Sequence, residues 1–260
     1  MIISISTGAF YKYNYIDILD MINETGCKNI EIFLNQSFKN EKFSDIEREV
    51  QKRNMVVQSI HAPLSILINP NETERDCIKK SIQLAKLFDA KIVVAHDVIG
   101  IRDKKYFSLD NEHKENLIFY KNNSDIEVVT ENVTQLQLPS FIQNPNEIIN
   151  FLDTNKLGMT YDVSHWGSLG RPAIEGYSLF KKYIRNIHIS DNLDGIEHVV
   201  LGNGKMDLNN FIKLLNEDEY SYPLTIELDL ENKARNPINC RKEAIDALCE
   251  SYNYIKKLVE

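Results

Sequence analysis

The chain has 260 residues, 43% of them hydrophobic, which is enough to bury a full core in one domain of the size of an α/β barrel. The formal net charge of −8 argues against tight, sequence-independent binding to nucleic acid, because that affinity depends on clustered lysine and arginine. Four scattered cysteines form no CxxC pair, and the first residues lack a basic start and a long apolar run. We therefore expect reduced thiols, no membrane span and a cytoplasmic protein.

Short runs rich in isoleucine and valine recur along the chain. Each run is mostly continuous in its apolar character, as in parallel strands that are buried on both faces. The predicted strands are residues 2–7, 29–34, 55–60, 91–96, 126–133, 157–163, 184–190 and 224–228.

Most stretches between these runs place apolar residues at steps of three and four, which gives a helix one face to pack on a sheet. The predicted helices are residues 15–24, 45–53, 72–88, 145–152, 173–184, 207–218 and 240–258. Residues 100–124 are more polar, and we expect there a loop and an irregular helix over the barrel mouth. The alternation predicts a single-domain (β/α)8 TIM barrel over residues 1–260, with a doubly wound open sheet as the alternative.

Side chains of metal-ligand type stand at the C-terminal ends of these strands. In a barrel those ends converge on one face, where active sites are built. Carboxylates mixed with imidazoles suit Zn²⁺, Mn²⁺ or Co²⁺, and a buried, unpaired glutamate is costly without a cation. The pattern therefore predicts a divalent metal site. The residues are His61, His96, Glu131, Asp162, His165, His188 and Glu227, with His198 in the loop after the seventh strand.

The segments that carry these residues give the chain a resemblance to the xylose isomerase-like TIM barrel superfamily. This superfamily contains sugar and sugar-phosphate isomerases and epimerases, together with nucleases of the endonuclease IV type. The resemblance covers nearly the whole chain. Its most telling segments are HAPL, TEN, YDVSH, NIHISDN, HVVLGNGKMD and IEL, in that order.

The resemblance to the epimerase branch implies one divalent ion held by the residues at the positions of Glu131, Asp162, His188 and Glu227. In such enzymes the two glutamates also move a proton between carbons beside a metal-bound carbonyl, through an enediolate. The resemblance thus implies catalytic roles for Glu131 and Glu227 and a contact between His165 and a substrate oxygen. The implied activity is that of a metal-dependent isomerase or epimerase acting on a sugar or sugar phosphate.

The resemblance to the endonuclease branch implies up to three zinc ions, with further ligands at His61, His96, His165 and His198. That branch has an aspartate two residues before the last histidine, where this chain has Ile196. An endonuclease IV-like hydrolase acting on abasic DNA is one alternative function. A barrel that binds a sugar without converting it is another, and related lyases and dehydratases share the isomerase pattern.

Four residues have roles that the sequence leaves open. Trp166 either forms an apolar wall for a sugar or packs under the rim. Gly202 and Gly204 either form a turn before the helix that Asp207 caps, or offer amides to a substrate phosphate. Glu31 either points into the site or supports a ligand from behind. The sugar, the number of ions and the formation of a homo-oligomer stay open too.

Overall fold

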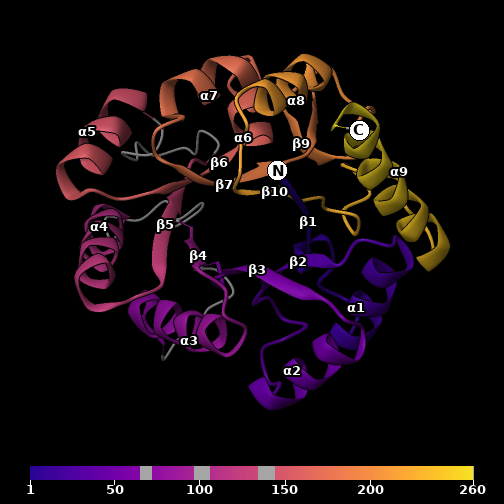
Figure 1. The fold of residues 1–260 in the computed structure, drawn as a ribbon, viewed down its shortest axis with the longest axis horizontal. Coiled ribbons are helices and arrows are strands. Elements are labelled where there is room, and N and C mark those ends of the chain that lie inside the picture. The colour runs from indigo at the N-terminus through magenta and orange to yellow at the C-terminus, as the bar shows by residue number, and fades with distance from the viewer. Residues whose placement is uncertain (65–71, 97–105, 134–143, 260) are drawn as a thin grey trace.

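The computed structural model describes residues 1–64, 72–96, 106–133 and 144–259. Eight parallel strands form a closed barrel at the centre of the molecule (Figure 1). The strands are β1 (Ile2–Ser6), β2 (Asn29–Phe33), β3 (Val56–His61), β4 (Ile92–Ala95), β5 (Glu127–Glu131), β6 (Met159–Asp162), β7 (Ile184–Ile189) and β10 (Pro223–Ile226). Neighbouring strands follow the chain order, and β10 pairs with both β7 and β1.

Helices form the outer ring around the strands (Figure 1). They are α1 (Tyr15–Glu24), α2 (Phe43–Lys52), α3 (Glu74–Leu87), α4 (Tyr106–Asn123), α5 (Pro145–Asn155), α7 (Ala173–Phe180), α8 (Leu208–Glu217) and α9 (Arg241–Val259). Shorter elements follow three strands at the mouth: η1 (Thr7–Ala9), α6 (Val163–Ser168) and the hairpin of β8 (Asp191–Leu193) and β9 (Ile196–Val199).

The predicted barrel is confirmed, because every predicted apolar run overlaps one of its strands, with bounds that differ by at most two residues. The strands are covered on the outside by helices, so runs such as β4 are buried throughout. Local signals set the helix starts: the Thr73 and Asp76 side chains form a capping box at α3, and Asp207 caps α8. The four cysteines are free thiols, as expected.

The barrel closes where β1 pairs with β10, with Ile5 beside Ile226. At the mouth, the loops after these two strands are joined as well. The Glu231 carboxylate accepts hydrogen bonds from the backbone amides of Tyr11 and Lys12, and the Leu230 amide donates to the Ala9 carbonyl. The first and last strands therefore form a continuous seam up to the rim.

The expectation of an irregular helix over the mouth is wrong for the residues that the structure describes. Helix α4 is regular and packs against α3 and β5 in the outer ring. Its sequence looks polar because it buries His113 and Asn116, which both bind the Glu74 carboxylate of α3. The expected loop, residues 97–105, lies outside the described residues. Within the described ranges, the helices include none that is long and apolar enough to cross a membrane.

Candidate metal centre

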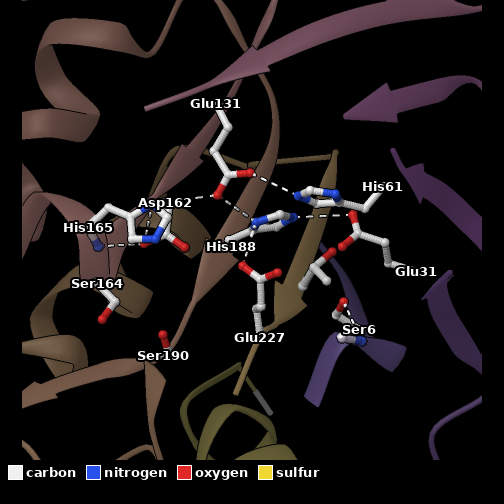
Figure 2. Close-up of polar contacts among 12 residues, drawn as sticks. Ser6, Glu31, His61, Glu131, Asp162, Ser164, His165, His188, Ser190 and Glu227 are labelled. Carbon is white, nitrogen blue, oxygen red and sulfur yellow. Dashed lines mark hydrogen bonds and ion pairs between the residues drawn. The ribbon is translucent and has the colours of Figure 1, made fainter. Parts of the chain in front are cut away.

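The predicted ligands converge at the C-terminal mouth of the barrel (Figure 2). His61, Glu131 and Asp162 are the last residues of β3, β5 and β6. His188 lies one residue before the end of β7, directly beside Asp162 in the strand register, and Glu227 follows β10. All five side chains are buried, so the closed barrel brings five strand ends with carboxylates or imidazoles together in one buried region.

Four of these residues form the largest of the possible ligand groups among the described residues. One ligand atom from each of Glu131, Asp162, His188 and Glu227 lies within 4.8 Å of the others. The Nδ1 atom of His188 is 3.0 Å from Oε1 of Glu131 and 2.8 Å from Oε2 of Glu227. Figure 2 shows the two glutamates on opposite sides of the His188 ring. We call these four residues the four-ligand cluster.

Glu31 contacts the other ring nitrogen of His188, Nε2, on the side away from Glu131 and Glu227. Its Oε2 atom accepts hydrogen bonds from the hydroxyl of Ser59 (2.7 Å) and the amide of Asn186 (3.1 Å). It lies 3.2 Å from Nε2 of His188. A carboxylate that accepts the Nε2 proton of a histidine fixes the ring and leaves Nδ1 toward the site. Of the two roles that the sequence left open for Glu31, the geometry favours support from behind.

The electrostatics of the cluster are dominated by carboxylates around one imidazole. Burial acts to lower the pKa of His188, but Glu131, Glu227 and Glu31 outweigh it and raise that pKa well above its usual value. Burial acts to raise the pKa of Glu227, yet His188 outweighs it and lowers this pKa to about 2. Glu131 and Glu227 are therefore ionised, and two buried negative charges so close together need a positive charge between them to be stable.

Asp162 has a buried oxygen that the other described residues leave unpaired. Its Oδ1 atom accepts the backbone N–H of His165 at 2.6 Å and so caps α6, while Oδ2 is buried without a hydrogen-bond partner. Burial is the main reason that the pKa of Asp162 is raised to about 6. The Asn132 side chain binds both the N–H and the carbonyl of Asp162, at 2.8 and 2.9 Å, and fixes its position.

A second cluster involves His165 and His198. The Nδ1 atom of His165 lies 2.8 Å from the carbonyl of Asn132, and Nδ1 of His198 lies 3.3 Å from the carbonyl of Glu227. With Nδ1 of each ring as the donor to a carbonyl, both Nε2 atoms are left as acceptors. These two Nε2 atoms face each other, 3.2 Å apart. Such a contact needs a proton or a cation between the nitrogens. Two imidazole ligands of one tetrahedral zinc ion are about 3.3 Å apart, given bond lengths of about 2.0 Å.

The remaining predicted ligands lie around Glu131. The Nε2 atom of His61 is 3.3 Å from Oε2 of Glu131, while its Nδ1 is 2.7 Å from the carbonyl of Ala62. His96, Glu131 and His165 also offer ligand atoms within 4.8 Å of one another. All eight predicted ligands are thus brought to one region, arranged in overlapping groups.

The donor set fits divalent cations. Among the described residues, no lysine or arginine pairs with Glu131, Asp162 or Glu227, so imidazoles are the only cationic protein groups in contact with these carboxylates. Buried carboxylates without a paired positive charge are strongly unfavourable. The unpaired Oδ2 of Asp162 is a position where an ion would satisfy an atom that the described residues leave without a hydrogen bond. The Nε2 atoms of His165 and His198 are hydrogen-bonded to each other, and an ion bound to both would take the place of the proton between them.

Trp166 has a different place from the predicted substrate wall. It is only 2% exposed, and its ring packs against Phe180 and Tyr161 with the Arg171 guanidinium over it. The ring belongs to the core under the rim, so we correct the expectation that it contacts substrate. The residue lies on α6, a short helix that turns its side chain away from the line of the strand.

Gly202 and Gly204 form a turn around Asp191, and not an open phosphate loop. The Gly202 amide donates to Oδ2 of Asp191 at 3.0 Å, and the Met206 amide donates to Oδ1 at 3.1 Å. The Gly202 amide is therefore already satisfied. A Cβ atom at Gly204 would lie 2.2 Å from Oδ1 of Asp191 and 2.6 Å from the carbonyl oxygen of Asn192. The structure thus favours the turn over the predicted phosphate contact.

The close approach at Gly204 predicts a loss of stability on substitution. Gly204→Ala is expected to lower the free energy of unfolding by about 1–3 kcal/mol, because the backbone of Asn192 cannot move away without disturbing the hairpin. Urea denaturation measures the change. The exposed neighbour Asn203→Ala is the control and should change the free energy by less than about 0.5 kcal/mol. Equal stability of the Gly204→Ala variant and the wild type would contradict the assigned turn.

Fold and site together define the class: a (β/α)8 barrel with a buried carboxylate and histidine centre at its C-terminal mouth. Comparison with known proteins agrees with this class. The chain belongs to the xylose isomerase-like TIM barrel family, whose sequence model matches residues 19–251.

The sequence identity between this chain and individual known proteins is low. The uncharacterized protein MJ1188 of Methanocaldococcus jannaschii is 25% identical over the full length of both chains. Inosose dehydratase of Mesomycoplasma hyopneumoniae is 25% identical over 86% of this chain and 84% of its own. Among solved structures, D-allulose 3-epimerase from Methylomonas sp. superposes with a TM-score of 0.75, at 14% identity, over 99% of this chain and 98% of that one. The last of these similarities concerns the fold alone.

Proposed function

We propose that this protein is a metal-dependent isomerase or epimerase that moves a proton beside the carbonyl group of a small sugar. The observation that carries the proposal is the four-ligand cluster, in which Glu131 and Glu227 stand on opposite sides of His188 within a buried mouth. Two carboxylates in that arrangement can serve as proton acceptor and proton donor to one bound molecule.

Glu131, Asp162, His188 and Glu227 would hold the principal divalent ion. When bound, such an ion supplies Lewis acidity that polarises a carbonyl oxygen and makes the neighbouring C–H more acidic. Glu31 keeps the His188 ring in place, and Asn132 does the same for Asp162. The burial of all these side chains keeps bulk water away from the reacting carbon.

The two glutamates provide the proton path. One carboxylate removes a proton from the carbon next to the carbonyl, and the other returns a proton to the opposite face, which inverts that carbon. A single carboxylate that moves the proton between adjacent carbons, while the hydroxyl proton passes to the former carbonyl oxygen, gives an isomer of the aldose and ketose type. In our proposal His165, buried beside Glu131, contacts a substrate oxygen.

The same first step also begins the loss of water from a hydroxy ketone. The inosose dehydratase relative is named for that reaction on a cyclic ketone, and the D-allulose 3-epimerase neighbour is named for inversion of a ketose. We therefore place the substrate among ketoses, aldoses and keto-cyclitols, with and without a phosphate group. Proton removal beside a carbonyl is the feature that unites them.

Metal content and hydrogen exchange test the proposal together. We expect protein purified without chelator to contain at least one divalent ion per chain by elemental mass spectrometry. We also expect an accepted sugar, incubated in D₂O, to gain deuterium at the carbon next to its carbonyl, as read by NMR, because a carboxylate returns a solvent-derived proton. Absence of bound ions after reconstitution with Zn²⁺, Mn²⁺ and Co²⁺ would refute the metal centre, and a panel without exchange would refute the proton transfer.

A hydrolase with several ions is the second candidate, and the facing nitrogens of His165 and His198 favour it. In that case a second ion near these histidines would help to activate a water molecule. The net charge of −8 and the exposed Ile196, at the position of the expected aspartate, count against a DNA substrate. Cleavage of an abasic-site duplex by the metal-loaded protein would establish this function in place of the first. Tight binding of a sugar without exchange or cleavage would indicate a binding protein.

A further inference from the structure

His198 has an unusual backbone conformation for a residue with a side chain. Its φ angle is +57°, in the left-handed region that glycine and asparagine adopt most easily. The tight turn of the hairpin is elsewhere, at Asp194 and Gly195, with φ angles of +54° and +90°. A conformation of this kind persists when surrounding contacts hold it, and such residues concentrate at functional sites.

The contacts that hold His198 come from outside its hairpin. Its N–H donates to the Ser164 hydroxyl at 3.1 Å. Its carbonyl oxygen accepts hydrogen bonds from the side chain of Asn236 at 2.8 Å and from the backbone N–H of Asp229 at 3.2 Å. The backbone of His198 is thus held by hydrogen bonds from α6 and from the segment after β10.

The Asn236 side chain links the backbone of His198 to Val200 and to Asp229. It is only 2% exposed. Its Nδ2 donates to the carbonyls of His198 and Asp229, at 2.8 and 2.9 Å, and its Oδ1 accepts the N–H of Val200 at 3.0 Å. The amide therefore ties the carbonyl of His198 to the N–H of Val200 and to the carbonyl of Asp229, in the segment that begins with Glu227.

We infer that Asn236 is a positioning residue for His198 and, through it, for a second divalent ion. The inference rests on the second candidate function, in which a further ion lies near these histidines and is bound by the Nε2 atoms of His165 and His198 that face each other. Without the Asn236 amide, the left-handed backbone of His198 loses one of the two hydrogen bonds to its carbonyl, together with the link to Val200 and Asp229. The backbone then relaxes, and the ring leaves its place 3.2 Å from His165. Asn236 itself contacts backbone only and has no part in the reaction.

Titration with Co²⁺ tests this role without an activity assay. Asn236→Asp keeps an acceptor for Val200 but turns the two donor contacts into repulsion between oxygens. We expect the variant to bind the first ion normally and the second about 10- to 100-fold more weakly, the range for outer ligand supports. The visible absorption of bound Co²⁺ and elemental mass spectrometry report each ion. Asn236→Ala, which adds no buried charge, is measured in parallel.

The control is Asn232→Asp, in the same loop. It adds the same charge, while its side-chain acceptor for the Ala234 amide is kept. It should leave both ions bound. His198→Ala should lose the second ion, and Asn236→Asp should have no further effect on ion binding in that background.

The outcomes separate this inference from the proposed function. If both Asn236 variants bind two ions like the wild type while His198→Ala loses one, the inference is overturned and the second site stands. If His198→Ala keeps both ions, or the wild type takes up only one, the second site and the inference are both overturned. The four-ligand cluster does not include His198, although its Asp162 also belongs to the group with His165 and His198, and neither result removes the first ion.

Discussion

Glu227→Gln is expected to lower kcat by at least about 1,000-fold on any sugar that the wild type converts, and Glu131→Gln is expected to do the same. An amide of the same shape cannot take up or return the proton, and removal of a general acid or base costs about 10²- to 10⁴-fold. Each variant also loses an anionic partner of His188, at 2.8 or 3.0 Å. Initial rates at saturating substrate measure the effect.

The control for this prediction is Glu217→Gln, on the exposed face of α8, which should keep the wild-type rate. A lower rate has two possible causes, loss of the ion and loss of proton transfer, and the metal content of each variant distinguishes them. A variant that keeps its ion but no longer exchanges substrate deuterium has lost proton transfer alone. Wild-type turnover in both glutamate variants would rule out the proposed mechanism.

Asp162→Asn is expected to have opposite effects on the metal-free and the metal-bound protein. Burial raises the pKa of Asp162 to about 6, from 3.8. The folded metal-free protein therefore holds this proton to a higher pH than the unfolded chain, and its stability falls as the pH rises from about 4 through about 6. At pH 8 the asparagine removes this penalty and should stabilise the metal-free protein by about 1–3 kcal/mol, at 1.36 kcal/mol per pKa unit.

With metal present the sign reverses. The variant lacks an anionic ligand, so we expect its ion affinity to fall by more than about 100-fold, beyond the usual cost of an outer support. The cap on α6 is retained, because asparagine caps helices as well as aspartate does. Thermal unfolding with chelator and with Zn²⁺ measures both effects. Asp153→Asn, at an exposed position in α5, is the control, and a metal-free Asp162→Asn protein less stable than wild type would contradict the prediction.

The strands and their order could be predicted because a barrel strand buried on both faces leaves a continuous apolar run. The residues at the strand ends followed from the same runs, and the structure brings all eight predicted ligands to the mouth. Their grouping could not be predicted, since it depends on the strand register, such as Asp162 beside His188. Nor did residue type alone show that Trp166 turns into the core on α6.

The main elements that the sequence did not reveal are those held by polar contacts. The buried face of α4 does not show in the sequence as an apolar stripe, because it includes His113 and Asn116, which bind Glu74 instead of apolar neighbours. The β8 and β9 hairpin is short and polar, yet its Asp194 and Gly195 pair is a strong signal for a two-residue hairpin turn. Asn236, buried among backbone groups, carries no pattern that distinguishes it from a surface asparagine.

Because β1 pairs with β10, the barrel can close only after β10 has been synthesised. The strand that begins the barrel leaves the ribosome first, but its partner β10 is the last of the described strands to emerge, and Glu227 follows directly on it. A nascent chain therefore carries Glu131, Asp162 and His188 before it can close the barrel around them. The four-ligand cluster is consequently completed late, by the same pairing that finishes the fold.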